Sequence, residues 1–246
     1  MIMNSTTVDA DTGRPSSTPA FARLLNVFTC PGEVFEEVLA SPHLPVNWLL
    51  PIFLNCILGG ALFLAGTVDS APTGDTVEGS AAISKAPVPA GAVSDLPSGP
   101  PGRSVTWRCA GLAAVGALGA AGTFWSALVL WSVGRVFLKT RFSYLKTLEI
   151  AGLAGLVSTL GTVVMLLLKA ATGNASAQPA LSLLLAEFNS ADKLQQTLAA
   201  LNVFHFWLAA VLSIGLAKLS AVSVREAAVW VFGYWIVLRW ALIALG

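Results

Sequence analysis

Residues 109–134 read CAGLAAVGALGAAGTFWSALVLWSVG and contain no charged side chain. Arg108 and Arg135 bracket this stretch, and Trp107 and Trp131 stand near its two ends. About 20 apolar residues cross the hydrocarbon core of a bilayer as an α-helix, and tryptophan favours the headgroup level. The stretch therefore predicts a transmembrane helix, longer than the membrane requires, that tilts or protrudes.

The composition of the whole chain fits a membrane protein. Of its 246 residues, 55% are hydrophobic and only 11% are charged, and the mean hydropathy is +0.75. A soluble domain usually carries about 25% charged residues, so this chain has too few to cover a water-facing body. The net charge is +1 and the basic residues form no continuous block, which argues against nucleic-acid binding.

Outward from 109–134, four further stretches are long and apolar enough to span a membrane. They are 46–67, 145–168, 202–219 and 227–245. Pro51 falls near the start of the first, where a missing N–H costs little, and Arg239 interrupts the last. We expect Arg239 to reach the near interface beside Trp240. The sequence thus predicts an all-α, polytopic membrane protein with five transmembrane helices and amphipathic interfacial helices.

The remaining segments are polar or amphipathic. Residues 1–20 form a polar tail and 69–104 a Gly-, Pro- and Ser-rich loop, and we expect both to lack regular structure. Residues 21–39 place apolar and acidic side chains on different faces, with Pro31 suited to a first helical turn. They predict an amphipathic helix at the membrane surface. A second interfacial helix is predicted over 181–201.

The distribution of basic residues predicts the orientation. One side of the predicted topology holds Arg14, Arg23, Arg135, Lys139, Arg141, Lys146, Lys218 and Arg225. The other side holds Lys85, Arg103, Arg108, Lys169, Lys193 and Arg239. Lys and Arg accumulate in cytoplasmic connections, and the compact cluster at 135–146 should outweigh charges spread along a long loop. We expect a cytoplasmic N-terminus and an outside C-terminus in the plasma (inner) membrane.

Few residues are candidates for a functional site. Glu149 lies at the edge of a predicted span, one turn from Lys146. It either forms an interfacial salt bridge with that lysine or, as an intramembrane carboxylate, takes part in transport. His43 and His205 stand near no carboxylate or cysteine pair, so we expect them at interfaces and not in a metal site.

The sequence contains no pattern typical of an enzyme. GxSxG, HExxH, Walker A and GxGxxG motifs are all missing. Cys30, Cys56 and Cys109 lack metal-ligand spacing and are expected to be free thiols. We therefore predict no catalytic, cofactor-binding or metal-binding residue, no cofactor and no enzymatic activity.

Small residues recur at every fourth position in two of the spans. The two series are Ala151, Gly155 and Thr159, and Ala209, Ser213 and Ala217. Such series let helix backbones approach closely in lipid, where little hydrophobic force drives helices together. They indicate either packing within the helical bundle or an interface between protein chains.

Three stretches resemble the Yip1 domain family of five-helix membrane proteins. The first is Leu24–Phe28 followed by Pro31 and Phe35–Val38, and the second is the basic linker and span at 137–168. The third is the most specific: it comprises Asn202, Phe204, Trp207, Leu212, Gly215, Leu216, Ser220 and Ala227. The resemblance covers most of 21–246, outside the 69–104 loop, and implies a single membrane domain there.

The resemblance is to prokaryotic-type members. Eukaryotic members carry an Asp-Leu-Tyr-Gly-Pro motif before the first span and are associated with Rab GTPases and vesicle traffic. Here Leu44-Pro45-Val46-Asn47 stand at that place. The resemblance therefore implies a membrane protein without an assigned reaction, and the trafficking role does not carry over.

Two hypotheses for the function follow. The first is a non-enzymatic protein that organises the membrane, in the manner of a trafficking scaffold, by associating with other membrane proteins or with itself. The second is a small permease or transporter component, whose substrate the sequence does not name. Against the second, the sequence shows no inverted repeat and predicts no buried charge pair.

Overall fold

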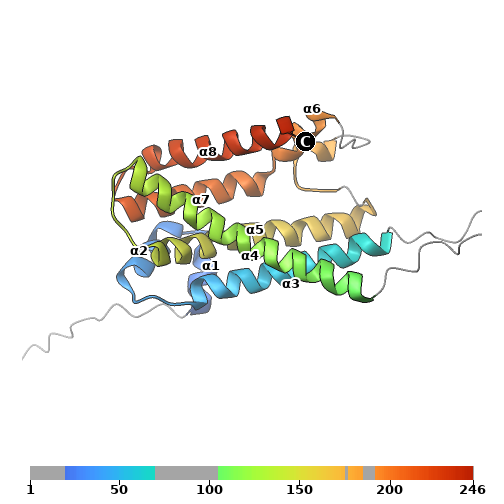
Figure 1. Cartoon of the computed structure of the whole chain (residues 1–246), viewed down its shortest axis with the longest axis horizontal. Helices are drawn as coiled ribbons and strands as arrows, with labels where there is room; N and C mark the ends of the chain where they lie inside the picture. The colour runs from blue at the N-terminus through green and yellow to red at the C-terminus, as the bar shows by residue number, and fades with distance from the viewer. Residues whose placement is uncertain (1–19, 70–104, 175–176, 185–191, 246) are drawn as a thin grey trace, which may run out of the picture.

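The computed structural model describes residues 20–69, 105–174, 177–184 and 192–245 (Figure 1). The tail predicted at 1–19 and the loop predicted at 70–104 lie outside these residues. Within them the structure is helical, with one isolated β-bridge between Ala180 and Asn202. The helices are α1 (Ala20–Asn26), α2 (Pro31–Ala40), α3 (Val46–Asp69), α4 (Val105–Val136), α5 (Tyr144–Thr172), the 3-10 helix η1 (Leu181–Leu184), α6 (Lys193–Ala200), α7 (Val203–Ser220) and α8 (Val224–Leu245).

Five of the described helices, α3, α4, α5, α7 and α8, are long and apolar enough to cross a membrane. They run in alternating directions, so that α1 and α2 lie at one end of the bundle and the end of α8 lies at the other (Figure 1). We call these the head end and the far end. The prediction of an all-α protein with five spans is confirmed.

The helices extend beyond the predicted bounds of the spans, and α4 and α5 extend the furthest. The span predicted at 109–134 lies within α4, and the one predicted at 145–168 continues in α5 to Thr172. Helix α5 ends where Gly173 adopts a left-handed conformation (φ 64°) and its N–H bonds to the carbonyl of Lys169 at 3.0 Å. The predicted bounds are set by the charged residues that flank each apolar stretch. The helix itself ends at its capping residue, so the ends of the helix and of the apolar stretch differ.

The head segment is two helices and not one. Pro31 takes the first position of α2, as predicted, and Glu33 lies in its first turn near the positive end of the helix. Val34, Phe35 and Val38 are buried, because this face of α2 packs on α5 and α7. The apolar face is therefore part of the protein core, and the position of this segment at the membrane surface stays a prediction.

The dense core occupies the half of the bundle nearest the head end. Helix α5 packs against α3, α4 and α7, and its residues 147–154 are all buried. A second group of buried side chains joins α4, α5, α7 and α8; it includes Leu130, Leu148, Leu216 and Val231. Burial of these apolar side chains, with close dispersion contacts, holds the helices together here.

Both small-residue series pack within the bundle. Ala151, Ala209, Ser213 and Ala217 are buried. Gly152 lies against the backbone of α3, and a Cβ added there would stand 2.5 Å from the Cα of Trp48. Of the two interpretations of these series, packing within the chain is the one that the structure supports.

The segment between α5 and α7 lies at the far end and connects these two helices. The predicted helix over 181–201 is described as η1 and α6, with residues 185–191 outside the description. Asp192 caps α6, its side chain accepting a hydrogen bond from the N–H of Leu194 at 2.8 Å. Asn202 caps α7 in the same way, accepting from the N–H of Phe204 at 2.9 Å.

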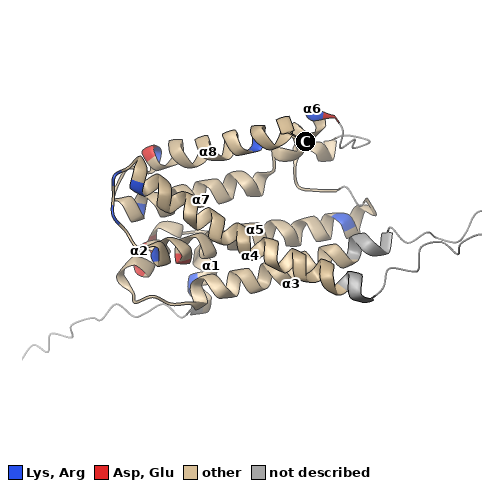
Figure 2. Cartoon of the chain, viewed as in Figure 1, with Lys and Arg blue, Asp and Glu red and all other residues tan. Residues whose placement is uncertain are grey.

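Charged residues gather at the head end, as Figure 2 shows. The described basic residues there are Arg23, Arg135, Lys139, Arg141, Lys146, Lys218 and Arg225. At the far end the basic residues are Arg108 at the start of α4, Lys169 and Lys193, and Arg239 lies within α8. The asymmetry predicted from the sequence is thus present in the described part of the bundle.

Candidate functional site

Glu149 is a buried carboxylate at the head end, on the second turn of α5. Its side chain is 2% exposed. The N–H₂ group of Asn47 donates to one oxygen at 2.8 Å, and the backbone N–H of Leu44 donates to the other at 3.3 Å. His43 Nδ1 stands 3.0 Å from that second oxygen, and Lys146 Nζ lies 3.5 Å from it. The carboxylate therefore joins the start of α3 to α5.

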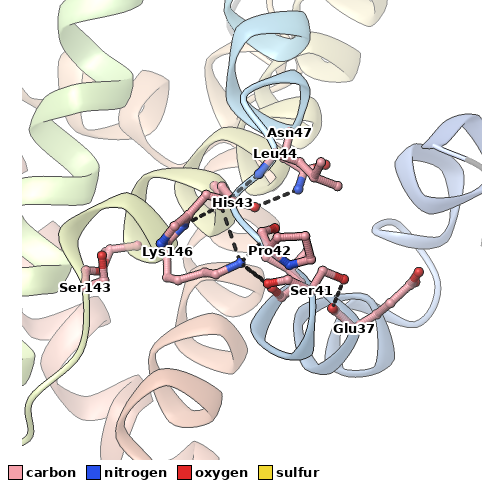
Figure 3. A network of polar contacts seen from close by, with 11 residues as sticks. Glu37, Ser41, Pro42, His43, Leu44, Asn47, Ser143 and Lys146 are labelled. Carbon is pink, nitrogen blue, oxygen red and sulfur yellow. Dashed lines mark hydrogen bonds and ion pairs between the residues drawn. The ribbon is translucent and has the colours of Figure 1, made fainter. Parts of the chain in front are cut away.

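Lys146 connects the same network to α2 (Figure 3). Its ammonium group donates to the carbonyl oxygens of Val38 at 2.6 Å, Ser41 at 2.8 Å and Pro42 at 3.3 Å. The carbonyls at a helix C-terminus lack partners within the helix and carry partial negative charge. Lys146 thus satisfies the end of α2 while it neutralises Glu149.

Two further ion pairs tie the head helices down. Arg23 of α1 bonds to Glu37 of α2 at 2.6 Å, and the arginine side chain is only 5% exposed. Lys218 near the end of α7 pairs with Glu36 on the other side of α2. In these contacts and in the Glu149 network, the charged groups are paired with one another within the chain. This is the arrangement expected of charges that stabilise the fold.

The network confirms one sequence prediction and corrects two. The Lys146–Glu149 pair is present, as predicted. The expectation that His43 stands near no carboxylate is wrong, because the bend between α2 and α3 brings it to Glu149. The prediction of no buried charge pair is also wrong, since both Glu149 and Arg23 are buried and paired.

A cavity of about 410 Å³ lies among α3, α4, α5, α7 and α8. Most of its lining surface is apolar, and we call it the polar cavity for the polar residues in its wall. Its polar lining residues are Asn55, Thr123, Ser126, Ser158, His205 and Arg239. Glycines 119 and 122 of α4 also line it, and a Cβ at either would meet no atom within 4 Å. Ligand pockets commonly have volumes of roughly 300–1,000 Å³, so this cavity is large enough for a small molecule.

His205 and Arg239 form a polar pair in the cavity wall. Arg239 Nη2 lies 3.2 Å from Nε2 and 3.3 Å from Nδ1 of the imidazole. The guanidinium carbon also lies 5.9 Å from the ring centre of Trp235, one turn earlier on α8, within cation–π range. At 1.5 Å per residue, Arg239 is about 9 Å along the helix from its end at Leu245.

The contact between these residues was not predicted. The guanidinium of Arg239 turns inward to His205, which stands in the first turn of α7. That both residues lie near the membrane surface stays a prediction. An arginine within an apolar stretch was itself a signal, because intramembrane charges are rare and commonly functional. Its partner on α7 had no signal in the sequence, since helix rotation decides which faces meet.

The described residues offer no metal centre. No group of three or more His, Cys, Asp or Glu side chains lies close enough together within them to hold a metal ion. Cys30 and Cys109 are exposed and Cys56 is half-buried, and all are free, as predicted.

The comparison with protein families gives a match over nearly the whole chain. The Yip1 domain matches residues 25–245, which include α2 and the five candidate spans. No curated protein and no solved structure matches the chain significantly. The resemblance drawn from residues 24–38, 137–168 and 202–227 is therefore confirmed. This chain is a multi-pass membrane protein that belongs to the Yip1 domain family.

Proposed function

We propose that this protein catalyses no reaction and acts by lateral association, through the outer face of α4, with another membrane protein or with a second copy of itself. Such contacts would let it organise other proteins in the membrane. The observation that carries the proposal is a difference between the outer faces of α4 and α8.

One row on the outer face of α4 is made of small residues, beside bulky exposed side chains such as Leu118 and Leu128. Ala113, Ala117 and Ala121 follow one another at every fourth position and are all exposed, so the chain's own helices do not cover them. Trp125 continues the same row and is also exposed. In lipid, a row of small residues allows a second helix backbone to approach closely and gain dispersion contacts.

The outer face of α8 is different in kind. Over residues 229–240 its exposed side chains are bulky: Val229, Ile236, Val237 and Trp240. Bulky apolar side chains fill the space beside lipid tails and keep another helix at a distance. The small residues of α5 and α7 are buried within the bundle, whereas those of α4 are left uncovered. This contrast supports α4 as the face that another helix contacts.

Cysteine crosslinking in native membranes tests the proposal. In a chain with Cys30, Cys56 and Cys109 replaced by serine, Ala117→Cys should give a discrete crosslinked product. Val237→Cys, also exposed but on α8, is the matched control and should give little. A product of twice the chain's mass would indicate self-association, and another mass would indicate a different partner. Equal labelling of both positions without any discrete product would contradict the proposal.

We also propose that the head end faces the cytoplasm of a cell whose plasma (inner) membrane holds the chain, with the C-terminus outside. The support is the excess of basic residues at that end of the described bundle. A periplasmic reporter enzyme fused to either terminus checks it. Activity is expected with the C-terminal fusion, and activity with the N-terminal one would reverse the orientation.

A permease component is the second candidate function, and the polar cavity is the observation that favours it. Membrane transporters bind their substrates near the middle of the bilayer, between helices. Solute uptake by liposomes that contain the purified chain tests it. Uptake that Arg239→Gln abolishes would favour transport over association, whereas a crosslinked partner without uptake would favour association.

A further inference from the structure

The polar cavity carries a positive charge that the described residues do not balance. Arg239 lines it, whereas none of the described Asp or Glu side chains does. On the lining helix α5, Glu149 is already engaged by His43, Asn47 and Lys146. A lone charge within a membrane-spanning helix is costly to insert. A counter-ion at Arg239 would offset that cost.

The guanidinium has hydrogen-bonding capacity to spare. Its described polar contact is with His205 through one nitrogen, Nη2, whereas arginine presents five N–H groups. The planar fork of arginine suits two oxygens of one anion at once. His205 contacts only one nitrogen of the guanidinium. The remaining N–H groups can therefore bind a ligand.

Further donors line the same space from other helices. Asn55 of α3 and Ser158 of α5 face the cavity, and neither side chain has a hydrogen-bond partner among the described residues. The hydroxyls of Thr123 and Ser126 on α4 donate to carbonyls of their own helix at 3.4 and 2.9 Å. Their oxygens still offer lone pairs to an ester or hydroxyl group.

The rest of the wall is apolar. Val115, Leu118, Leu208 and Leu212 line it together with the polar residues. The helices α4 and α8 share buried contacts near the head end, at Leu130 and Val231, and α4 diverges from α8 toward the far end (Figure 1). The cavity thus combines one cation, neutral donors and an apolar wall within the membrane-spanning bundle.

We propose that this cavity is a binding site for a phosphate group, held by Arg239 with His205 and Asn55. Phosphate offers several acceptor oxygens in a tetrahedral arrangement, which matches a fork of N–H donors with an amide beside it. The group belongs either to a membrane lipid, whose chains would leave between α4 and α8, or to a small molecule free in water. The inference does not depend on the lateral association proposed above.

Two probes distinguish these sources with the full-length chain in an uncharged detergent. Inorganic phosphate is titrated against chloride at equal ionic strength, and the tryptophan fluorescence of the chain is followed, to which Trp235, within cation–π range of the guanidinium, contributes. In the second arm, native mass spectrometry counts the lipids retained from micelles that contain phosphatidylglycerol. A free phosphate ligand predicts a saturable fluorescence change, and a lipid ligand predicts one tightly retained phosphatidylglycerol.

The key variant is Arg239→Gln, and its control is Arg225→Gln. Arg225 is on the same helix but exposed and outside the cavity. Arg239→Gln should weaken binding of the responding probe about tenfold or more, whereas Arg225→Gln should leave it unchanged. Arg239→Lys keeps the charge but loses the planar fork, so an intermediate loss is expected.

Three results would overturn the proposal. They are no response of the native chain to either probe, equal binding by the Arg239→Gln and native chains, and equal losses in both glutamine variants. If Arg239→Gln does not yield folded protein, His205→Gln replaces it. This variant keeps the guanidinium but removes its described polar partner, and unchanged binding there would remove His205 from the site.

Discussion

The two halves of the bundle both hold charged side chains, but they use them differently. At the head end, Glu149 contacts His43, Asn47, Leu44 and Lys146, and the side chain is almost wholly buried. In the half toward the far end, the guanidinium of Arg239 borders a cavity and contacts one imidazole and one indole ring.

The contrast separates structural charges from those available for binding. A charge whose partners all come from the same chain resists removal, because each partner would be left without its own. A charge beside an open, polar space can accept an outside partner. The same contrast appears in the packing: Gly152 is pressed against α3 at the head end, whereas Gly119 borders empty space.

Removing Lys146 should have the largest effect on stability. In Lys146→Met, the Glu149 carboxylate stays buried without its cation, and three carbonyls near the end of α2 lose a donor. The free energy of unfolding should fall by about 3–5 kcal/mol. Denaturation in mixed micelles, followed by helical circular dichroism, measures it.

A double variant makes this prediction sharper. Lys146→Met combined with Glu149→Gln removes both charges, so it should be less destabilised than the sum of the two single variants predicts. Arg141 is an exposed residue in the connection before α5 and supplies the control: Arg141→Met should change the free energy of unfolding little. Strict additivity would mean that Lys146 and Glu149 do not act as a pair.

Gly152→Ala should have the next largest effect. Its new Cβ would meet the backbone of Trp48 and the carbonyl of Asn47, which cannot move aside as a flexible side chain would. A loss of about 1–3 kcal/mol is expected from overpacking. Gly119→Ala is the matched control, and it should be neutral or gain up to about 1 kcal/mol from the higher helix propensity of alanine. If both variants lose the same stability, the two halves do not differ in packing.

His43→Ala tests an outer member of the Glu149 network. The imidazole side chain is 47% exposed, and Glu149 keeps its contacts with Asn47, Leu44 and Lys146 when it is removed. A loss of about 0.5–1.5 kcal/mol is expected, the usual contribution of one hydrogen bond. Thermal unfolding in detergent would show it, and a loss as large as that of Lys146→Met would make His43 a central member.

Lys218→Ala should have the smallest effect. The pair that Lys218 forms with Glu36 is the most exposed of the described ion pairs. Such pairs contribute about 0–1 kcal/mol, and salt screens them. The unfolding curves of the native chain and the variant should differ slightly at low salt and converge at high salt. A large loss that persists at high salt would place this pair among the buried ones.

The spans could be predicted from the sequence, because crossing a bilayer imposes a length and an apolar composition that one stretch shows by itself. Pro31 at the first position of α2 and the Lys146–Glu149 pair were also predictable, since both depend on neighbours within one helical turn. These features are local: each depends on residues that are close together in the sequence.

The contacts between distant segments could not be predicted. His43 and Glu149 are 106 positions apart, and His205 and Arg239 are 34 apart on different helices. Hydropathy says that Arg239 lies in a span but not whether it faces lipid, water or protein. That depends on how α8 rotates against α7, and packing along both helices sets the rotation.

The most direct test compares the unfolding of Glu149→Gln and Arg239→Gln in the same detergent without phosphate or anionic lipid. Glu149→Gln leaves Lys146 buried without its carboxylate and should be clearly destabilised, whereas Arg239→Gln should stay within about 1 kcal/mol of the native chain. That result would mean that the head-end charge holds the fold and the cavity charge is free for a ligand. An Arg239→Gln variant as unstable as Glu149→Gln, or more so, would contradict the division.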